Sequence, residues 1–213
     1  MQSTGREIIS RDRACCEMAK QKNEVENFSD FFLEIGLLKR VKRSGWWVAG
    51  IENPESVADH SFRTAVIGFV LAKKEKADVE KVLLMCLFQD VPEARILDLH
   101  KVAHRYFDVR KGEISAFKEQ LELLPQDFQK ELLKLFDEYQ NDLSTEGIVA
   151  RDADLLECAI QAKEYLELGN KETIEWIERI GPLLRTKTAK EIFNSMKKKK
   201  SMNWWAHLKK TER

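Results

Sequence analysis

Glycine, proline and histidine are scarce in this 213-residue sequence, which contains nine, four and four of them. Alternating runs of β-branched residues are scarce as well, so the sequence predicts an all-α fold. No apolar run approaches the roughly 18 residues that a membrane span needs. The charged N-terminal segment lacks the apolar stretch that a signal peptide requires. We therefore expect no membrane partner.

Net charge is absent too, because 36 Lys and Arg balance 36 Asp and Glu. A balanced chain has no overall field to attract nucleic acid, so we expect no nucleic-acid partner and local recognition of any phosphate. The four cysteines form no CxxC pair, and Cys86 and Cys158 lie within apolar helical patterns. This usage predicts core thiols and a cytoplasmic location.

The length suits one domain with a single core. We expect residues 28–213 to form it, C-terminal helices included, and residues 1–27 to be an added arm or a frayed helix. Apolar periodicity and capping residues predict helices at about 28–39, 56–73, 79–89, 92–95, 113–139 with a break at Pro125, 144–168, 171–180 and 187–197. The apolar side of the helix at 56–73 carries Phe62, Val66, Phe69 and Val70. Residues 40–55 break the period and predict a loop.

A few polar residues stand where apolar ones are expected. His60 opens a helix beside Asp59, and a single helix-borne histidine is more often structural than a ligand. Asp90 ends an otherwise apolar helix, where an ionised group is costly unless it is paired or bound to a metal. Glu93 and Asp98 follow within eight residues of Asp90. This group of carboxylates favours a functional site over a structural histidine.

Two more carboxylates, Asp152 and Asp154, interrupt the long helix at 144–168. Asp152 shares an apolar stripe with Leu156, whereas Asp154 shares one with Cys158. Periodicity therefore predicts a buried carboxylate and leaves open which of the two serves a metal. A cap or a salt bridge would explain either one alone, but explains the whole set of carboxylates poorly.

The segments SVADHS, LFQDVPEARILDL, EYQ and ARDADLLE resemble the signature of HD-domain phosphohydrolases, and RSGW at 43–46 extends the likeness. Their order and spacing resemble the 5′-deoxyribonucleotidase subgroup, which includes the bacterial YfbR-type enzymes and their archaeal and eukaryotic relatives. The likeness runs from about Phe28 to Leu168. It implies a single HD-domain helical bundle that hydrolyses (deoxy)nucleoside 5′-monophosphates to nucleoside and phosphate, often as a homodimer.

The resemblance also implies one divalent metal ion, with Co, Mn, Fe, Zn and Mg not distinguished. Its ligands would be His60, the pair Gln89 and Asp90, and the distant Asp154. The preference for Asp154 over Asp152 comes from this resemblance alone. Mixed nitrogen and oxygen ligands suit a borderline transition ion.

Four further roles follow from the same likeness. Glu93 matches a carboxylate beside the nucleophilic water, a candidate general acid or base. Asp98 matches an acidic residue that organises the water network near the sugar 3′-hydroxyl. Arg43 matches a phosphate-binding residue, for which a guanidinium is geometrically suited. Trp46 either stacks on the base or serves as a packing anchor.

Gln89 is the departure from this pattern, because the family has histidine there. An amide oxygen is a neutral and weaker ligand, so metal affinity should fall. The substitution fits natural loss of catalysis, natural tuning, or a deliberate change. The other site residues are all retained, which favours a single selected or introduced change over general decay. The sequence thus supports three hypotheses: an impaired phosphohydrolase, a non-catalytic nucleotide-binding or interaction module, and a structural protein with salt-bridged carboxylates.

Overall fold

The computed structural model describes residues 23–203 except Leu143, together with Trp205 and Leu208. Helices make up the regular structure of this part of the chain, where the sole β pairing is an isolated bridge between Lys42 and Ser56. The prediction of an all-α fold is therefore confirmed. No helix among the described residues is both long and apolar enough to cross a bilayer. Residues 1–22, which make up most of the predicted arm, lie outside the described residues.

The helices lie close to their predicted positions. A first helix occupies residues 23–35 and continues into the 3₁₀ turn η1 (Gly36–Lys39). The others are α2 (Gly45–Val48), α3 (Val57–Glu75), α4 (Val79–Phe88), α5 (Glu93–Ile96), α6 (Val109–Leu121), α7 (Gln126–Asn141), α8 (Thr145–Glu167), α9 (Ile174–Ile180) and α10 (Lys187–Lys197). Further 3₁₀ turns are η2 (Ala103–Arg105), η3 (Lys171–Thr173), η4 (Gly181–Leu183) and η5 (Ser201–Asn203). The predicted loop at 40–55 contains α2.

Capping side chains fix where the central helices begin. The Ser56 hydroxyl accepts from the Asp59 backbone N–H, and the Asp59 carboxylate accepts from the Ser56 N–H, a reciprocal capping box. Asp78 caps α4 and Ser144 caps α8 in a simpler way, because only the side chain of the cap residue accepts backbone N–H groups. Pro125 stands at the N-cap of α7 and separates it from α6. These starts set the register of every side chain that follows.

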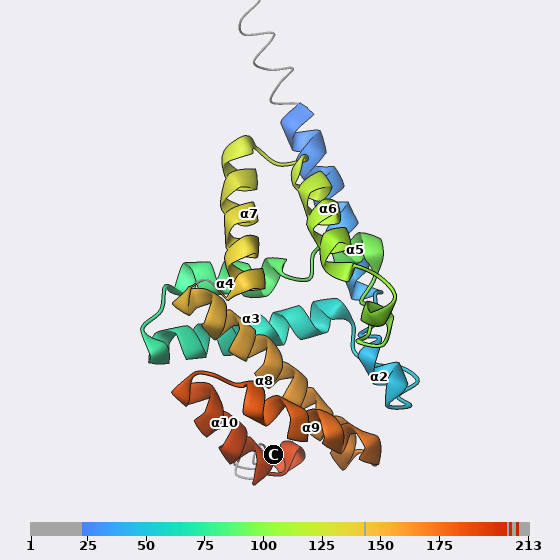
Figure 1. Ribbon diagram of the computed structural model, residues 1–213, viewed down its shortest axis with the longest axis vertical. Coiled ribbons are helices and arrows are strands. Elements are labelled where there is room, and N and C mark those ends of the chain that lie inside the picture. The colour runs from blue at the N-terminus through green and yellow to red at the C-terminus, as the bar shows by residue number, and fades with distance from the viewer. Residues whose placement is uncertain (1–22, 143, 204, 206–207, 209–213) are drawn as a thin grey trace, which may run out of the picture.

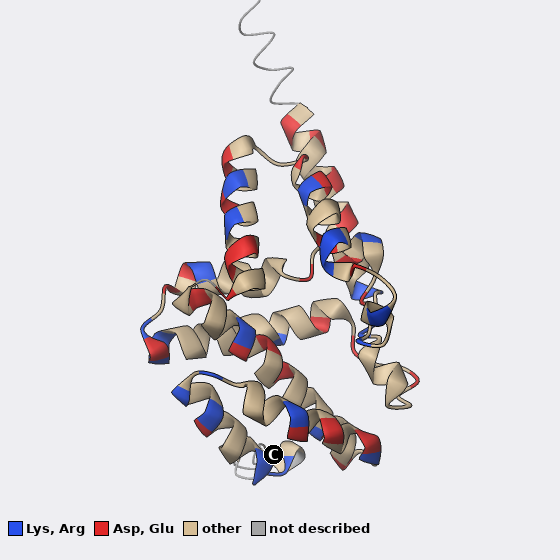
Figure 2. Cartoon of the chain, viewed as in Figure 1, with Lys and Arg blue, Asp and Glu red and all other residues tan. Residues whose placement is uncertain are grey.

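The helices form a bundle in which α3 and α4 lie across the middle and α8 crosses them (Figure 1). The first helix, α6 and α7 extend to one side of this layer, and α9 and α10 cover the other. One apolar cluster joins α3, α4 and α8 with α9 and α10. A second cluster joins η1, α5, α6 and α7. Basic and acidic positions are interspersed over the outer helices (Figure 2).

The inner face of α3 consists mainly of small residues, which was not expected. Phe62, Val66, Phe69 and Val70 do share one face, but that face is exposed, with Phe62 at 71%. Besides Val57, His60 and Leu71, the buried positions hold small side chains and Gly68. A Cβ at Gly68 would lie 2.7 Å from the Cys86 sulfur of α4, so the helices meet too closely for large side chains. The four larger apolar residues predicted to be buried therefore lie on the exposed face.

Candidate active site

His60 lies in the first turn of α3, where the Ser56 cap places it, and its side chain is fully buried. The ring Nδ1 donates a hydrogen bond to Glu157 of α8. On the other side of the ring, Nε2 lies 3.0 Å from Asp154 Oδ1 and 3.5 Å from Asp90 Oδ2. Nδ1 is thus fixed by the Glu157 carboxylate, and Nε2 faces the carboxylates of Asp90 and Asp154.

The electrostatics of this cluster centre on a shared positive charge. Burial and Arg43 lower the pKa of His60, but hydrogen bonds to Asp154 and Glu157 outweigh them and raise the pKa to about 10. Burial opposes ionisation of Asp154, yet its bond to His60 holds the pKa of that carboxyl below its usual range. The carboxylates therefore require a cation, and an imidazolium proton and a divalent metal ion compete for the same place.

Gln89 ends α4 and is only 5% exposed. Its Oε1 is buried without a hydrogen-bond partner, while Nε2 lies 3.5 Å from Asp90 Oδ2. A buried amide oxygen left unpaired costs about 1–3 kcal/mol, and such atoms often indicate a missing ligand or ion. Rotating the amide by a half turn would bring the oxygen beside Asp90. The donor set of one imidazole, two carboxylates and one amide oxygen thus fits a divalent cation.

Arg43, Glu93 and Asp98 line a cavity of about 710 Å³ beside this cluster. The Arg43 guanidinium lies 3.9 Å from Asp90 and 3.6 Å from Asp98. Asp98 also accepts the Ser44 backbone N–H at 3.2 Å. Leu97, just before Asp98, adopts a left-handed φ of 66°, a conformation that costs a non-glycine residue about 1–3 kcal/mol. Strain of this kind concentrates at functional sites.

Glu93, in the first turn of α5, is a buried carboxyl with an unpartnered Oε2. Burial, with Asp90 and Asp98 nearby, raises the pKa of Glu93 well above its usual range. A carboxyl that holds its proton near neutral pH is suited to proton transfer.

Asp154 has two supports that sequence analysis missed. The Tyr139 hydroxyl donates to Asp154 Oδ2 at 3.2 Å, and Arg151 donates to that hydroxyl at 2.8 Å. The Arg151 guanidinium also lies 3.9 Å from the centroid of the Tyr139 ring. Tyr139 belongs to the EYQ segment, which marked the position without revealing its role.

Asp152 has a different environment from Asp154. It is fully buried and accepts the backbone N–H groups of Arg185 and Thr186, at 3.0 and 2.6 Å. These bonds tie the segment before α10 to α8. Of the two carboxylates that periodicity left open, Asp154 joins the His60 cluster and Asp152 serves the fold.

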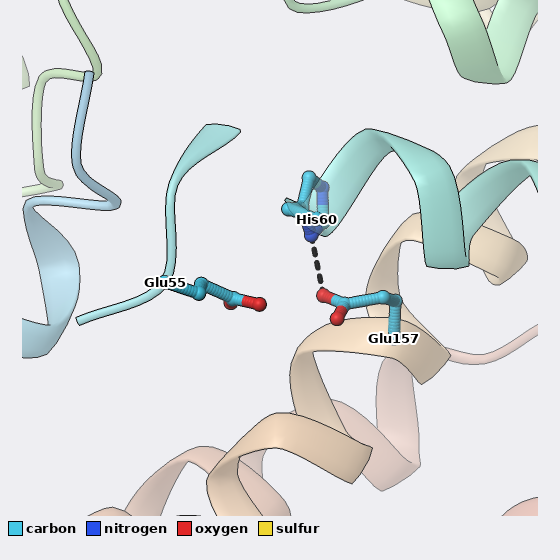
Figure 3. Close-up of side chains that lie close together, drawn as sticks. All are labelled: Glu55, His60 and Glu157. Carbon is cyan, nitrogen blue, oxygen red and sulfur yellow. Dashed lines mark hydrogen bonds and ion pairs between the residues drawn. The ribbon is translucent and has the colours of Figure 1, made fainter. Parts of the chain in front are cut away.

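A second acidic group lies behind His60, and Figure 3 shows Glu55 and Glu157 pointing toward it. Ligand atoms of these three residues come within 4.8 Å of one another. Both oxygens of Glu157 already accept hydrogen bonds, however. One accepts from His60, and the other accepts from Arg63 Nε at 2.9 Å. We interpret this group as a hydrogen-bonded support, because a carboxylate on Nδ1 orients a histidine whose Nε2 binds a metal.

Replacing Glu55 with glutamine is expected to stabilise the protein at alkaline pH. Burial, followed by repulsion from Glu157, raises the pKa of Glu55 to about 7. A carboxyl whose pKa is higher in the folded state destabilises that state as pH rises from about 4.5 to 7. Glutamine keeps an oxygen for the Trp46 indole N–H, 3.1 Å away, without the charge.

The measurement is thermal unfolding of both proteins at pH 5 and pH 8. The melting temperature of Glu55→Gln should exceed that of the parent by roughly 2–4 °C at pH 8, equivalent to about 1 kcal/mol, with little difference at pH 5. An equal shift at both pH values would contradict the assignment.

Trp46 lies in α2 and is only 3% exposed. Its ring packs edge-on against Tyr165, at 5.2 Å between centroids, and in a tilted arrangement against Trp176, at 5.6 Å. With its N–H bound to Glu55, Trp46 has the contacts of the packing anchor, the second of the two roles predicted for it.

His60 of α3, Asp154 of α8 and Asp90, in the turn after α4, thus converge in a helical bundle as a set of ligands suited to a metal ion. The profile of the HD-domain family matches residues 35–197, and the chain belongs to this family. The chain is 35% identical over 146 residues to 5′-deoxynucleotidase HDDC2 of Bos taurus, covering 68% of this chain and 71% of that protein. It is 26% identical over 178 residues to the 5′-deoxynucleotidase of Erwinia tasmaniensis, covering 77% and 87%.

The fold is similar to a conserved hypothetical protein from Pyrococcus furiosus, with a TM-score of 0.67 and 36% identity. The match covers 79% of this chain and 98% of the archaeal one. The expected family is therefore confirmed by sequence and by fold.

Proposed function

We propose that this protein is a metal-dependent phosphohydrolase that converts (deoxy)nucleoside 5′-monophosphates to nucleoside and phosphate. The observation that carries the proposal is the convergence of His60 Nε2, Asp90 and Asp154 beside a cavity that Arg43 also lines. The relatives named 5′-deoxynucleotidase support this substrate class. Cys86 and Cys158 are free thiols, which supports a reducing cytoplasm as its location.

The proposed metal ligands are His60, Asp90 and Asp154, with Gln89 as a fourth and weaker one. When bound, a divalent ion acidifies a water and offsets charge on the phosphoryl group; Co, Mn, Fe, Zn and Mg are all candidates. Arg43 binds a phosphate oxygen, and its pairing with Asp90 and Asp98 holds the guanidinium in place.

Glu93 and Asp98 complete the proposed machinery. Glu93 moves a proton at its unpartnered Oε2, which the raised pKa suits. Asp98, fixed by the Ser44 N–H, orients water and the sugar 3′-hydroxyl. Trp46 borders the same cavity and shapes its wall.

Gln89 supports a second candidate, a nucleotide-binding protein that has lost turnover. A single neutral ligand in place of an imidazole weakens the metal site and leaves Arg43 and the cavity intact. This candidate predicts that a nucleoside monophosphate raises the melting temperature without phosphate release.

Phosphate release from a panel of ribo- and deoxyribonucleoside 5′-monophosphates, in Mn²⁺ or Co²⁺, tests the proposal. The phosphohydrolase predicts metal-dependent release that Asp90→Asn abolishes. Calorimetry with the same nucleotides distinguishes the second candidate, which predicts binding without release. Neither binding nor release would contradict both candidates.

We also propose that the protein is a homodimer formed through the exposed face of α3. Phe62, Val66, Phe69 and Val70 give that face an apolar stripe at helical spacing. A twofold axis sets one such stripe against its copy, so the surface needs no other partner.

Light scattering during size-exclusion chromatography measures the assembly. The parent chain should have twice the mass of a monomer, and Val66→Asp should have the mass of one. Lys130→Asp, at an exposed position of α7, serves as the control and should remain a dimer. A monomeric parent would contradict the assembly and would leave the enzymatic proposal untouched.

A further inference from the structure

We propose that Trp176 is the side chain on which the nucleoside base stacks, and that it makes the pocket prefer nucleotides to base-free phosphate esters. This inference rests on the proposed function. The cavity of about 710 Å³ is lined by Arg43 and Asp98 and also by Trp176 of α9. Its volume lies within the ~300–1,000 Å³ typical of small-molecule sites. One ligand can therefore contact the charged residues and the indole together.

Trp176 exposes part of its ring to the cavity, whereas the ring of Trp46 is buried. Trp46 is almost completely buried, and its N–H is bound to Glu55. Trp176 is partly exposed, and it lines the cavity. Of these two neighbouring indoles, Trp176 has the surface available for a base.

The wall around Trp176 combines apolar side chains with a charged rim of Glu172, Glu175 and Arg179. Leu155 of α8 lines the cavity with Ile180 and Leu183, which follow Trp176 on α9 and η4. The nearby Arg179 is paired with Glu175 at 2.8 Å, so its charge is already matched. Apolar side chains, one aromatic face and a rim with two carboxylates and one guanidinium suit a flat heterocycle better than a second phosphate.

The indole of Trp176 is also held in position before a ligand binds. It packs against Trp46 at 5.6 Å between centroids with an interplanar angle of 36°, and Trp46 packs in turn against Tyr165. A ring fixed by such contacts loses little conformational entropy on binding.

The test compares Trp176→Leu with Trp176→Phe. Both side chains are apolar and pack against Trp46, but only phenylalanine has a ring face. The ligands are dAMP and 2-deoxyribose 5-phosphate, which carries the same phosphate and sugar without a base. Calorimetry gives the affinity for each ligand, and kcat/KM gives the discrimination between them in turnover. The melting temperature of each variant reports on folding.

Trp176→Leu should weaken dAMP binding about tenfold, the size of one base–aromatic stack, and 2-deoxyribose 5-phosphate binding far less. Trp176→Phe should retain most of the preference. Trp47→Leu, at a tryptophan that is 52% exposed and does not line the cavity, is the matched control. If Trp176 had only a structural role, Trp176→Leu would lower the affinity for both ligands equally and would lower the melting temperature as well.

Equal losses for the two ligands in Trp176→Leu would overturn the assignment of Trp176 and leave the proposed function standing. Equal affinity of the parent chain for dAMP and the base-free ester would do the same. Binding of neither ligand, in the parent and in Gln89→His, would overturn the proposed function and this inference together.

Discussion

Replacing Gln89 with histidine is expected to raise both metal content and phosphate release. The Gln89 amide oxygen is buried without a partner, and its amide nitrogen lies 3.5 Å from Asp90 Oδ2, so a histidine here would place a ring nitrogen within reach of the cluster. Histidine has a similar volume and is a stronger ligand for Mn²⁺, Co²⁺ or Zn²⁺. We expect kcat/KM to rise at least about tenfold, equivalent to about 1.4 kcal/mol of transition-state stabilisation.

The metal content of purified Gln89→His, measured by elemental analysis, should approach one ion per chain. Gln126→His, on the exposed first turn of α7, controls for the addition of a histidine and should change neither quantity. Gln89→Leu, which removes the oxygen, should bind less metal than the parent. If Gln89→His gains neither metal nor activity, Gln89 is not a ligand position.

The second prediction with a large expected effect concerns Asp152 and Asp154, two residues apart on α8, which we expect to have different roles. Asp154→Asn should reduce phosphate release at least about a hundredfold, because removing a metal ligand eliminates most of the catalytic charge stabilisation. Its melting temperature should fall less than that of Asp152→Asn, since the asparagine oxygen can still accept from His60 and only the bond from the Tyr139 hydroxyl is lost.

Asp152→Asn should show the opposite pattern. The Arg185 N–H donates to both Asp152 oxygens and the Thr186 N–H donates to Oδ2, so asparagine removes the charge and places an amide N–H against the Arg185 N–H where Oδ1 now accepts. Losing charge-assisted bonds in a buried site costs about 2–4 kcal/mol, or a melting temperature lower by roughly 4–15 °C. Activity per folded molecule should be retained. Paired calorimetric scans and phosphate assays measure both effects, and a large loss of activity in Asp152→Asn with full stability would reverse the assignment.

The parts of the fold that sequence predicted are those fixed locally. Ser56, Asp78 and Ser144 begin α3, α4 and α8 because a short polar side chain satisfies free backbone N–H groups within its own turn. Apolar spacing predicted the lengths of these helices. The orientation of α3 was not predictable, because the choice between two apolar faces depends on how closely α4 approaches Gly68.

The candidate site divides in the same way. The resemblance of the motifs to the HD-domain family predicted His60, Asp90 and Asp154 as metal ligands. The support Glu157 is brought to His60 only by the fold, since it lies 97 residues away along the chain. Trp176 likewise enters the cavity through the packing of α9 on α8, outside any motif. Glu157 had one sequence signal, as the last residue of ARDADLLE, and Trp176 had none.

A crystal soaked in Mn²⁺ and measured for anomalous scattering tests the central assignment most directly, because two acidic groups lie on opposite sides of one histidine ring. We predict a single anomalous peak on the Nε2 side of His60, within about 2.0–2.3 Å of that nitrogen and of Asp90 and Asp154 oxygens. A peak between Glu55 and Glu157 on the Nδ1 side, or none at saturating Mn²⁺, would contradict it.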